Sequence, residues 1–433
     1  MAVIQEPFIV MPVGKDHLYQ QEIFMTLFSR KKLKPLAEQV IVITGASSGI
    51  GMATALRAAE QGACVVLASR NEVALAEIQR RIEDMGGEAI YVVADVGSQD
   101  DVKTIVSETS KAFGGFDTWV NCAGVSILGR LEEVSDEDNR RLFDTNYWGI
   151  VYGSLAAAEH LKIKGGAIIN LGSLLSDMSI PIQGMYSASK HAVKGFTDAL
   201  RIEIDADKSP ISVTLIKPAA IATPFFSHAK NYTHQEAKAP PPVYAPEEVA
   251  YAILHAAQSP VRDVRIGGSG YAMASLNAHA PSLMDWINSK FMIKSQFSDN
   301  PKSRHKNNLH ESGEDGIVRG KDGAYAMNSL YTRATLNPVM TGLALTAIGV
   351  AAYALLGRKG GTTVGKTALK TVNTGLGLIM PLQNVIATKG ILKYLEKKSV
   401  VASRSIQSNA KSLNKAVNEN AKIVKGKTMS LFK

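Results

Sequence analysis

Residues 40–51 read VIVITGASSGIG, a short run of valine and isoleucine that leads into three glycines. A continuous Val/Ile run is typical of a strand that is buried on both faces of a parallel sheet. Residues 53–60 follow the glycines and predict a helix. Glycines between a strand and a helix allow a tight turn, in which backbone N–H groups at the helix start approach a pyrophosphate. Residues 40–60 therefore indicate a nucleotide-binding unit.

Apolar runs of similar length recur along the chain and alternate with helical stretches; they cover residues 63–68, 89–93, 118–120, 167–171 and 212–216. This alternation predicts an α/β fold with a doubly wound parallel sheet, which binds ligands at the carboxyl ends of its strands. Pro246-Glu247-Glu248 opens a further helix, and residues 261–266 predict the last strand. We expect this domain to cover residues 39–271, after a lead segment of residues 1–38 to which the sequence assigns no role.

Ser69 and Arg70 follow the second apolar run. An enzyme that uses NAD(H) usually carries a carboxylate here, which binds the ribose 2′-OH. The chain has no acid at this point, and a guanidinium can pair with a 2′-phosphate in fork geometry. Arg70 therefore favours NADP(H) over NAD(H), with an ordinary surface arginine at a strand end as the alternative.

Tyr186 and Lys190 stand four residues apart in a segment that continues as a helix, so their side chains share one face. Reduction of a carbonyl develops negative charge on the oxygen, which needs a proton donor within hydrogen-bond reach. A free tyrosine titrates near ~10, and a nearby ammonium favours the phenolate. We therefore expect Lys190 to lower the pKa of Tyr186, so that the phenol works as an acid or base near neutral pH.

The glycine spacing G-x-x-x-G-x-G, followed much later by Tyr-x-x-x-Lys, resembles the short-chain dehydrogenase/reductase family. The resemblance covers residues 38–270, about half of the chain. It implies a Rossmann-type sheet and an oxidoreductase that moves a hydride between a nicotinamide dinucleotide and a carbonyl or alcohol. It also implies a catalytic set in which Ser173 polarises the substrate oxygen, Lys190 also binds ribose hydroxyls and Asn146 helps to hold a water chain beside Tyr186.

The same resemblance implies cofactor-binding residues in six segments of the chain. These are Thr44, Gly45, Ser47, Ser48, Gly49, Ile50 and Gly51; Ser69 and Arg70; Asp95 and Val96; Asn121, Ala123 and Gly124; Tyr186 and Lys190; and Pro218, Ile221 and Thr223. Cys122 and Ala219 depart from the Ala and Gly that are usual in the family. Family members are commonly dimers or tetramers, so the resemblance also implies a homo-oligomer.

Residues 223–246 are polar and rich in proline, and they are too long for a routine connection between elements, so they predict a mobile substrate loop. Cys64 and Cys122 lack metal-ligand or C-x-x-C spacing and predict two reduced thiols in a reducing compartment, with no metal. The first thirty residues contain no continuous apolar stretch of the kind that a secretory signal needs. We therefore expect a cytoplasmic catalytic domain.

Residues 272–335 are expected to form an extension and linker, polar from residue 299 onward. Residues 339–357 carry no charge, and that length just reaches the range of a membrane span. A second uncharged stretch, residues 371–388, is interrupted by Pro381. We expect an apolar helical region over residues 336–390, attached to a membrane as a hairpin or in the plane of the surface. A buried or oligomerising helix is the alternative.

The chain's formal net charge of +9 belongs to its C-terminal end. From residue 389 to the last residue there are eleven Lys/Arg and two acids, so the rest of the chain is formally neutral. The basic tail, residues 391–433, has few aromatic residues, which argues against specific nucleic-acid binding and favours an anionic membrane surface. A lipophilic substrate would fit that location. A noncatalytic dinucleotide-binding redox sensor and a membrane scaffold stay open as alternatives.

Overall fold

The computed structural model describes residues 31–301, 307–313, 315–320, 326–338, 341–344 and 346. Residues up to Thr332 belong to one compact unit, and residues from Arg333 onward belong to a second. Most of the lead segment, most of the expected membrane region and the whole basic tail lie outside the described residues. Among the helices that are described, none is long and apolar enough to cross a bilayer.

A seven-stranded sheet forms the centre of the first unit, in the order β10-β7-β6-β4-β1-β2-β3. Every neighbouring pair is parallel. The strands are β1 (Val40–Thr44), β2 (Cys64–Ser69), β3 (Ala89–Val93), β4 (Thr118–Asn121), β6 (Gly166–Leu171), β7 (Ile211–Pro218) and β10 (Asp263–Ile266). The predicted doubly wound parallel sheet is confirmed, because each of the seven apolar runs forms one of these strands.

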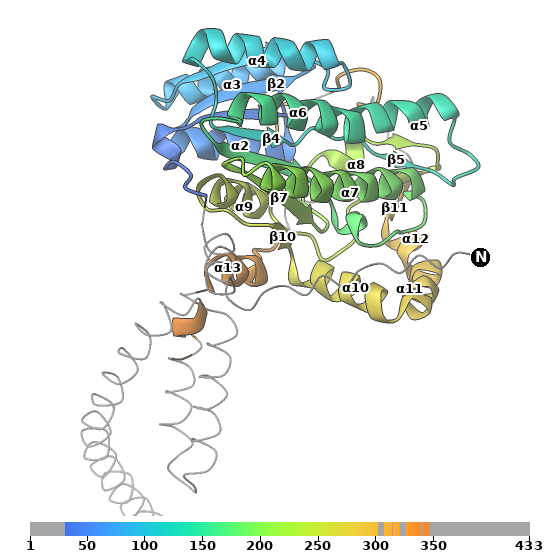
Figure 1. The fold of residues 1–433 in the computed structure, drawn as a ribbon. Helices are drawn as coiled ribbons and strands as arrows, with labels where there is room; N and C mark the ends of the chain where they lie inside the picture. Colours follow the sequence, from blue (N-terminus) through green and yellow to red (C-terminus); the bar gives the residue numbers. More distant parts are fainter. Residues whose placement is uncertain are drawn as a thin grey trace, which may run out of the picture. The chain divides into compact units, whose positions relative to one another are not determined.

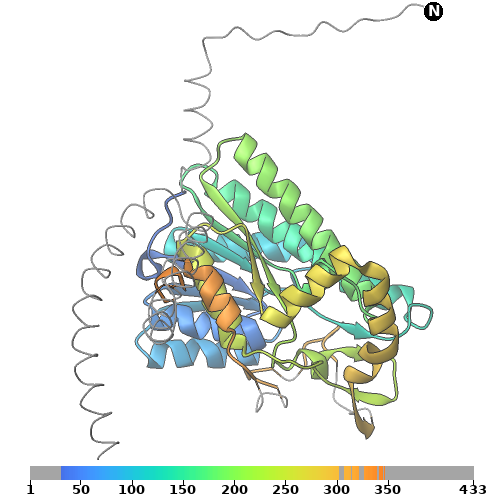
Figure 2. The ribbon, with the colours of Figure 1, turned by 90° about the horizontal axis from the view of Figure 1, so that it is seen from below.

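Helices cover both faces of this sheet (Figures 1 and 2). On one face, α2 (Gly49–Glu60) packs against α9 (Pro246–Gln258), the helix predicted from its N-terminal proline and acids. The other face carries α6 (Gly149–Leu161) and α7 (Gly184–Ala206). Two further helices, α3 (Glu72–Asp84) and α4 (Gln99–Phe113), make the crossovers beside β2 and β3. Central strands such as β1 and β2 need this double cover, since their apolar side chains are buried on both faces.

The strand order reverses between β1 and β4, which are neighbours in space although β2 and β3 separate them in the chain. A crevice forms at such a switch point, at the carboxyl ends of the strands. The glycine turn follows β1 and residues 122–126 follow β4, so both segments reach this crevice. The sheet therefore brings the two segments together.

Smaller elements complete the described part of the chain. They are η1 (Leu36–Glu38), β5 (Ile127–Leu128), α5 (Asp136–Phe143), the π-helix η2 (Asp144–Trp148), η3 (Leu174–Ser176), α8 (Phe225–His228), β8 (Lys230–Asn231), β9 (Gln235–Ala237), α10 (Gly268–His279), α11 (Pro281–Ile287), η4 (Asn288–Met292), α12 (Ile293–Ser295), β11 (Phe297–Pro301) and α13 (Leu330–Leu336).

The chain beyond residue 271 folds back onto the domain, which differs from the expected extension and linker. β11 pairs with β9 through Phe297 and Ala237. Met284 and Leu309 are buried in one apolar cluster with Leu142. The compact unit runs to Thr332, further than the expected end at residue 271. Single apolar side chains anchor this region, which explains why its polar composition suggested a linker.

Candidate active site

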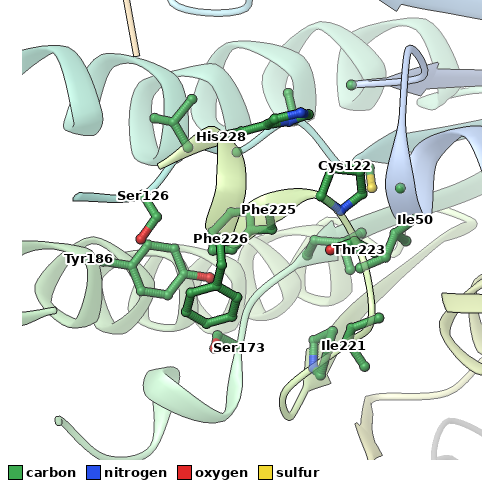
Figure 3. Close-up of a pocket in the computed structure, with 18 of the residues that line it drawn as sticks. Ile50, Cys122, Ser126, Ser173, Tyr186, Ile221, Thr223, Phe225, Phe226 and His228 are labelled. Carbon is green, nitrogen blue, oxygen red and sulfur yellow. The ribbon is translucent and has the colours of Figure 1, made fainter. Parts of the chain in front are cut away.

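A cavity of about 290 Å³ opens at the carboxyl ends of the strands. Its lining includes most of the residues predicted for the site, namely Gly45, Ser47, Ser48, Gly49, Ile50, Gly51, Ser69, Arg70, Asp95, Val96, Ala123, Gly124, Ser173, Tyr186, Lys190, Pro218, Ile221 and Thr223. In Figure 3, Tyr186 and Ser173 lie on one side of the cavity, and Ile50 and Cys122 lie on the other. The cavity therefore joins the two groups of residues that the sequence singled out.

Two predicted residues, Thr44 and Asn121, lie behind the cavity wall. The Thr44 hydroxyl accepts hydrogen bonds from the N–H groups of Cys122 (3.1 Å) and Ala123 (3.3 Å). The Asn121 amide donates to Asn170 Oδ1 (2.8 Å) below the sheet end. Both side chains thus hold the segment after β4 in place, and neither lines the cavity.

Asn146 also lies behind the wall, in the π-helix η2. Its side chain donates to the carbonyl of Val125 (2.9 Å) and accepts from the N–H of Val125 (2.8 Å). These paired bonds fix the loop that follows β4. π-Helical turns often occur at functional sites, and here the turn aims Asn146 at the loop.

The glycine turn is shaped by close contact with the segment after β4. Gly45 has φ +68°, and a Cβ there would lie 2.7 Å from Ala123 Cα, so a larger residue would not fit. The helix α2 begins four residues later, at Gly49. The first N–H groups of a helix have no partner within it and suit a phosphate. Gly45 therefore lets the turn pack against the segment after β4, and the start of α2 lines the cavity, where it fits the pyrophosphate of a dinucleotide.

Tyr186 and Lys190 project from α7 toward the end of β6. Lys190 Nζ donates to the carbonyl of Leu171 (2.8 Å) and lies 5.7 Å from the centroid of the Tyr186 ring. Burial raises the pKa of Tyr186 to about 12, although a hydrogen bond with Ser173 opposes the rise. Burial also lowers the pKa of Lys190 to about 8.

The expected lowering of the pKa of Tyr186 by Lys190 is therefore wrong for this structure. The loss of water around the phenol outweighs the favourable effect of Ser173, and the pKa of Tyr186 ends above its ordinary value. The phenol thus holds its proton throughout the neutral pH range. That is the form that can donate a proton to a substrate oxygen.

Ser173 takes its orientation from a short helix that follows β6. Its hydroxyl accepts from the N–H of Leu175 (3.1 Å), and its own N–H donates to Ser176 Oγ (3.1 Å). These bonds form a capping box at the start of η3. The hydroxyl of Ser173 also forms a hydrogen bond with Tyr186, which holds the two side chains together.

Arg70 stands at the end of β2, as predicted, but its guanidinium is engaged by a distant part of the chain. It donates to the backbone carbonyls of Asn308, Leu309 (3.2 Å) and His310 (3.2 Å). Burial lowers its pKa. Asp95, which the resemblance placed among the cofactor-binding residues, forms an ion pair with Arg141.

The part of the cavity beside Tyr186 has an apolar wall. The residues that line it there are Leu174, Leu175, Ile180, Phe225, Phe226, Met273 and Met292. The rings of Phe225 and Tyr186 meet edge to face, with centroids 5.6 Å apart. Phe225 and Phe226 belong to the expected substrate loop, whereas Met273 and Met292 come from the region that was expected to form an extension and linker. Within the described residues, no cluster of His, Cys, Asp or Glu could hold a metal ion.

Comparisons with known proteins agree on one family. A family model described as short chain dehydrogenase matches residues 39–233. The chain is 45% identical over 331 residues to the uncharacterized oxidoreductase YxnA of Bacillus subtilis, which covers 75% of this chain and 92% of that protein. It is 42% identical over 198 residues to 11-beta-hydroxysteroid dehydrogenase A of Sesamum indicum, which covers 45% of this chain and 55% of that protein.

A solved structure shows the same fold. It is a short chain dehydrogenase/reductase from Burkholderia phymatum in complex with NAD, and it matches with a TM-score of 0.53 and 26% sequence identity. The match covers 58% of this chain and 96% of the other. The fold is thus that of a known group of proteins.

Proposed function

Since the chain belongs to the short-chain dehydrogenase family, we propose that it transfers a hydride between NADP(H) and a lipophilic ketone, aldehyde or secondary alcohol. One observation carries the proposal: Tyr186, Ser173 and Lys190 meet at one end of a cavity whose other end is the glycine turn. The nicotinamide, when bound, supplies or accepts the hydride. The protein residues bind the substrate oxygen and move its proton.

Tyr186 is the proton donor in the direction of reduction. Its phenol is protonated at neutral pH, because its pKa is about 12. As the carbonyl carbon gains a hydride, the carbonyl oxygen takes the phenolic proton, so the product is a neutral alcohol. Ser173 donates a hydrogen bond to the same oxygen, and the Lys190 ammonium stabilises the phenolate that is left behind.

The choice of NADP(H) rests on Arg70 and on the absence of an acid at the end of β2. The chain there reads Ser69, Arg70 and Asn71, and each of them lines the cavity. A guanidinium and a 2′-phosphate form charge-assisted hydrogen bonds, whereas a 2′-hydroxyl gains much less from the same group.

A lipophilic substrate is favoured by the apolar wall beside Tyr186. Rings and thioethers such as Phe225, Met273 and Met292 offer a polar ligand few partners, but they pack well against a rigid hydrocarbon. The relative from Sesamum indicum bears the name of a hydroxysteroid dehydrogenase. We therefore propose a rigid, ring-containing alcohol or ketone of that kind.

The test is a fluorescence titration of the full chain with NADPH and with NADH. Replacing Arg70 with Asp should weaken NADPH binding at least about tenfold, because a charge-assisted pair is lost and a repulsion is added. NADH binding should change much less. Arg80→Asp, which makes the same charge change on the exposed face of α3, is the matched control. Binding of neither dinucleotide would refute the proposal.

Turnover separates an enzyme from the alternative of a redox sensor. Wild-type protein should oxidise or reduce members of a panel of apolar ring alcohols and ketones, and Tyr186→Phe should lower the rate by roughly 10²–10⁴-fold. Tight dinucleotide binding with no turnover across that panel would favour the noncatalytic sensor instead.

A further inference from the structure

Residues 307–313 and 315–320, which we call the strap, lie across the dinucleotide end of the cavity. The strap holds the Arg70 guanidinium at four backbone carbonyls, those of Asn308, Leu309, His310 and Glu311. Both terminal nitrogens of the fork are engaged in this way. A 2′-phosphate that needs the same fork must displace these carbonyls.

The strap also bonds to the glycine turn. The N–H of Gly49, the first residue of α2, donates to the carbonyl of Ile317 (3.0 Å). Gly316 donates in turn to the carbonyl of Ser47 (2.9 Å). A carbonyl oxygen therefore sits on a helix N-terminus, the position that suits an oxygen of a phosphate.

Asp315 adds a negative charge inside the cavity. Its side chain is 6% exposed and lines the cavity, where Asn71 donates to it (3.2 Å). His228 Nδ1 lies 3.9 Å from the same carboxylate. A buried carboxylate opposes the entry of phosphate groups, since like charges repel strongly away from bulk water.

The strap is anchored at its first residues. Leu309 is fully buried in the apolar cluster that includes Leu142. The carbonyl of Leu309 also accepts from Arg141 Nε (3.0 Å), and His310 Nε2 lies 2.7 Å from Asp138 Oδ1. Because buried and charged contacts both hold it, the strap is an ordered part of the cavity wall.

We propose that the strap is an internal ligand that competes with the dinucleotide for Arg70 and for the N-terminus of α2. The proposal rests on the proposed use of a dinucleotide at this site. The apparent affinity then equals the intrinsic affinity multiplied by the fraction of molecules with the strap open. The strap should weaken the binding of NADPH more than the binding of NADH, because the 2′-phosphate of NADPH needs the Arg70 fork. The strap thereby reduces the preference for NADPH over NADH that Arg70 provides.

The experiment loosens the strap at Gly316 in the full chain. Gly316 has φ +87°, where a β-branched residue is strained, and a Cβ there would meet no atom within 4 Å. Gly86 has φ +81° and equally open surroundings at the end of α3, so Gly86→Val is the matched control. Gly316→Val should lower the Kd for NADPH about five- to tenfold and the Kd for NADH less. A Kd that is unchanged or higher would overturn the proposal.

Hydrogen exchange of the wild-type chain gives a second readout that needs no variant. Saturating NADPH should speed the exchange of the Gly316 and Gly320 amides, which bond to Ser47 and Ala222 when the strap is in place. Slower exchange would mean that the strap closes over the dinucleotide, and this would refute competition while leaving the proposed function intact. Failure of wild type and Gly316→Val alike to bind NADPH or NADH would instead refute the proposed function.

Discussion

Lys190 is a charged residue whose burial costs free energy. Its side chain is almost fully buried, and its amino group donates to the carbonyl of Leu171. Burial lowers its pKa from 10.5 to about 8, which means that Lys190 binds its proton less tightly in the folded chain than in the unfolded chain. The difference corresponds to about 3 kcal/mol of lost stability at neutral pH. A residue with this cost is expected at a site where charge is needed for chemistry.

Lys190→Met should therefore stabilise the chain while it removes activity. Methionine fills a similar volume without a buried charge, so the free energy of unfolding at pH 7 should rise by about 1–3 kcal/mol, less the cost of leaving the Leu171 carbonyl unpaired. Turnover should fall at least about a hundredfold. Urea unfolding and an activity assay measure the two effects.

The pH dependence provides the control for Lys190→Met. Below pH 8 both the folded and the unfolded wild type carry the ammonium, so the penalty is complete. Between pH 8 and 10.5 the folded chain loses its proton first, and wild type gains stability relative to the variant. The advantage of Lys190→Met should shrink across this window. A variant that is less stable than wild type at pH 7 would contradict this account of Lys190.

At the scale of elements, the π-helix η2 and the loop after β4 form one structural unit. Asn146 is fully buried and satisfies both backbone groups of Val125. Asn146→Ala would leave a buried N–H and a buried carbonyl without this partner, at a cost of about 2–4 kcal/mol for the two groups.

We expect Asn146→Ala to lower the urea midpoint and to weaken dinucleotide binding, because Ala123 and Gly124 of the same loop line the cavity. Asn139→Ala, on the neighbouring α5, is a control, because the Asn139 amide makes a long hydrogen bond of 3.5 Å to the carbonyl of Val134. If Asn146→Ala keeps wild-type stability and dinucleotide affinity, the paired bonds to Val125 do not position the loop after β4.

Elements with a strong local pattern could be predicted from the sequence, and elements held by scattered contacts could not. β1 and the glycine turn combine a buried Val/Ile run with a conformation that excludes larger residues, so a short stretch of sequence is enough to predict both. The strap has neither feature. It is anchored by the single apolar residue Leu309 and by backbone carbonyls on Arg70, and any amino acid supplies a carbonyl. Tyr186 lines the cavity, but its pKa depends on burial, which four-residue spacing does not report.

At the scale of the whole molecule, charge is distributed unevenly along the chain. The formal net charge of +9 resides in the residues from 389 onward, which lie outside the described structure, and the rest of the chain is formally neutral. Lys and Arg near an anionic leaflet each contribute about 1 kcal/mol of attraction, which falls off within a Debye length. We propose that this tail holds the enzyme at an anionic membrane surface, where a lipophilic substrate is concentrated.

Sedimentation of the full chain with vesicles tests the tail. Binding to vesicles that contain phosphatidylserine should fall sharply between about 0.05 and 0.5 M salt, because screening shortens the reach of the attraction. Replacing Lys422, Lys425, Lys427 and Lys433 with Gln should have the same effect at low salt. The same number of Lys→Gln changes at exposed positions of the first unit, Lys103, Lys111, Lys162 and Lys164, should not. Equal binding to purely zwitterionic vesicles would show that apolar contact, and not charge, attaches the chain to the membrane.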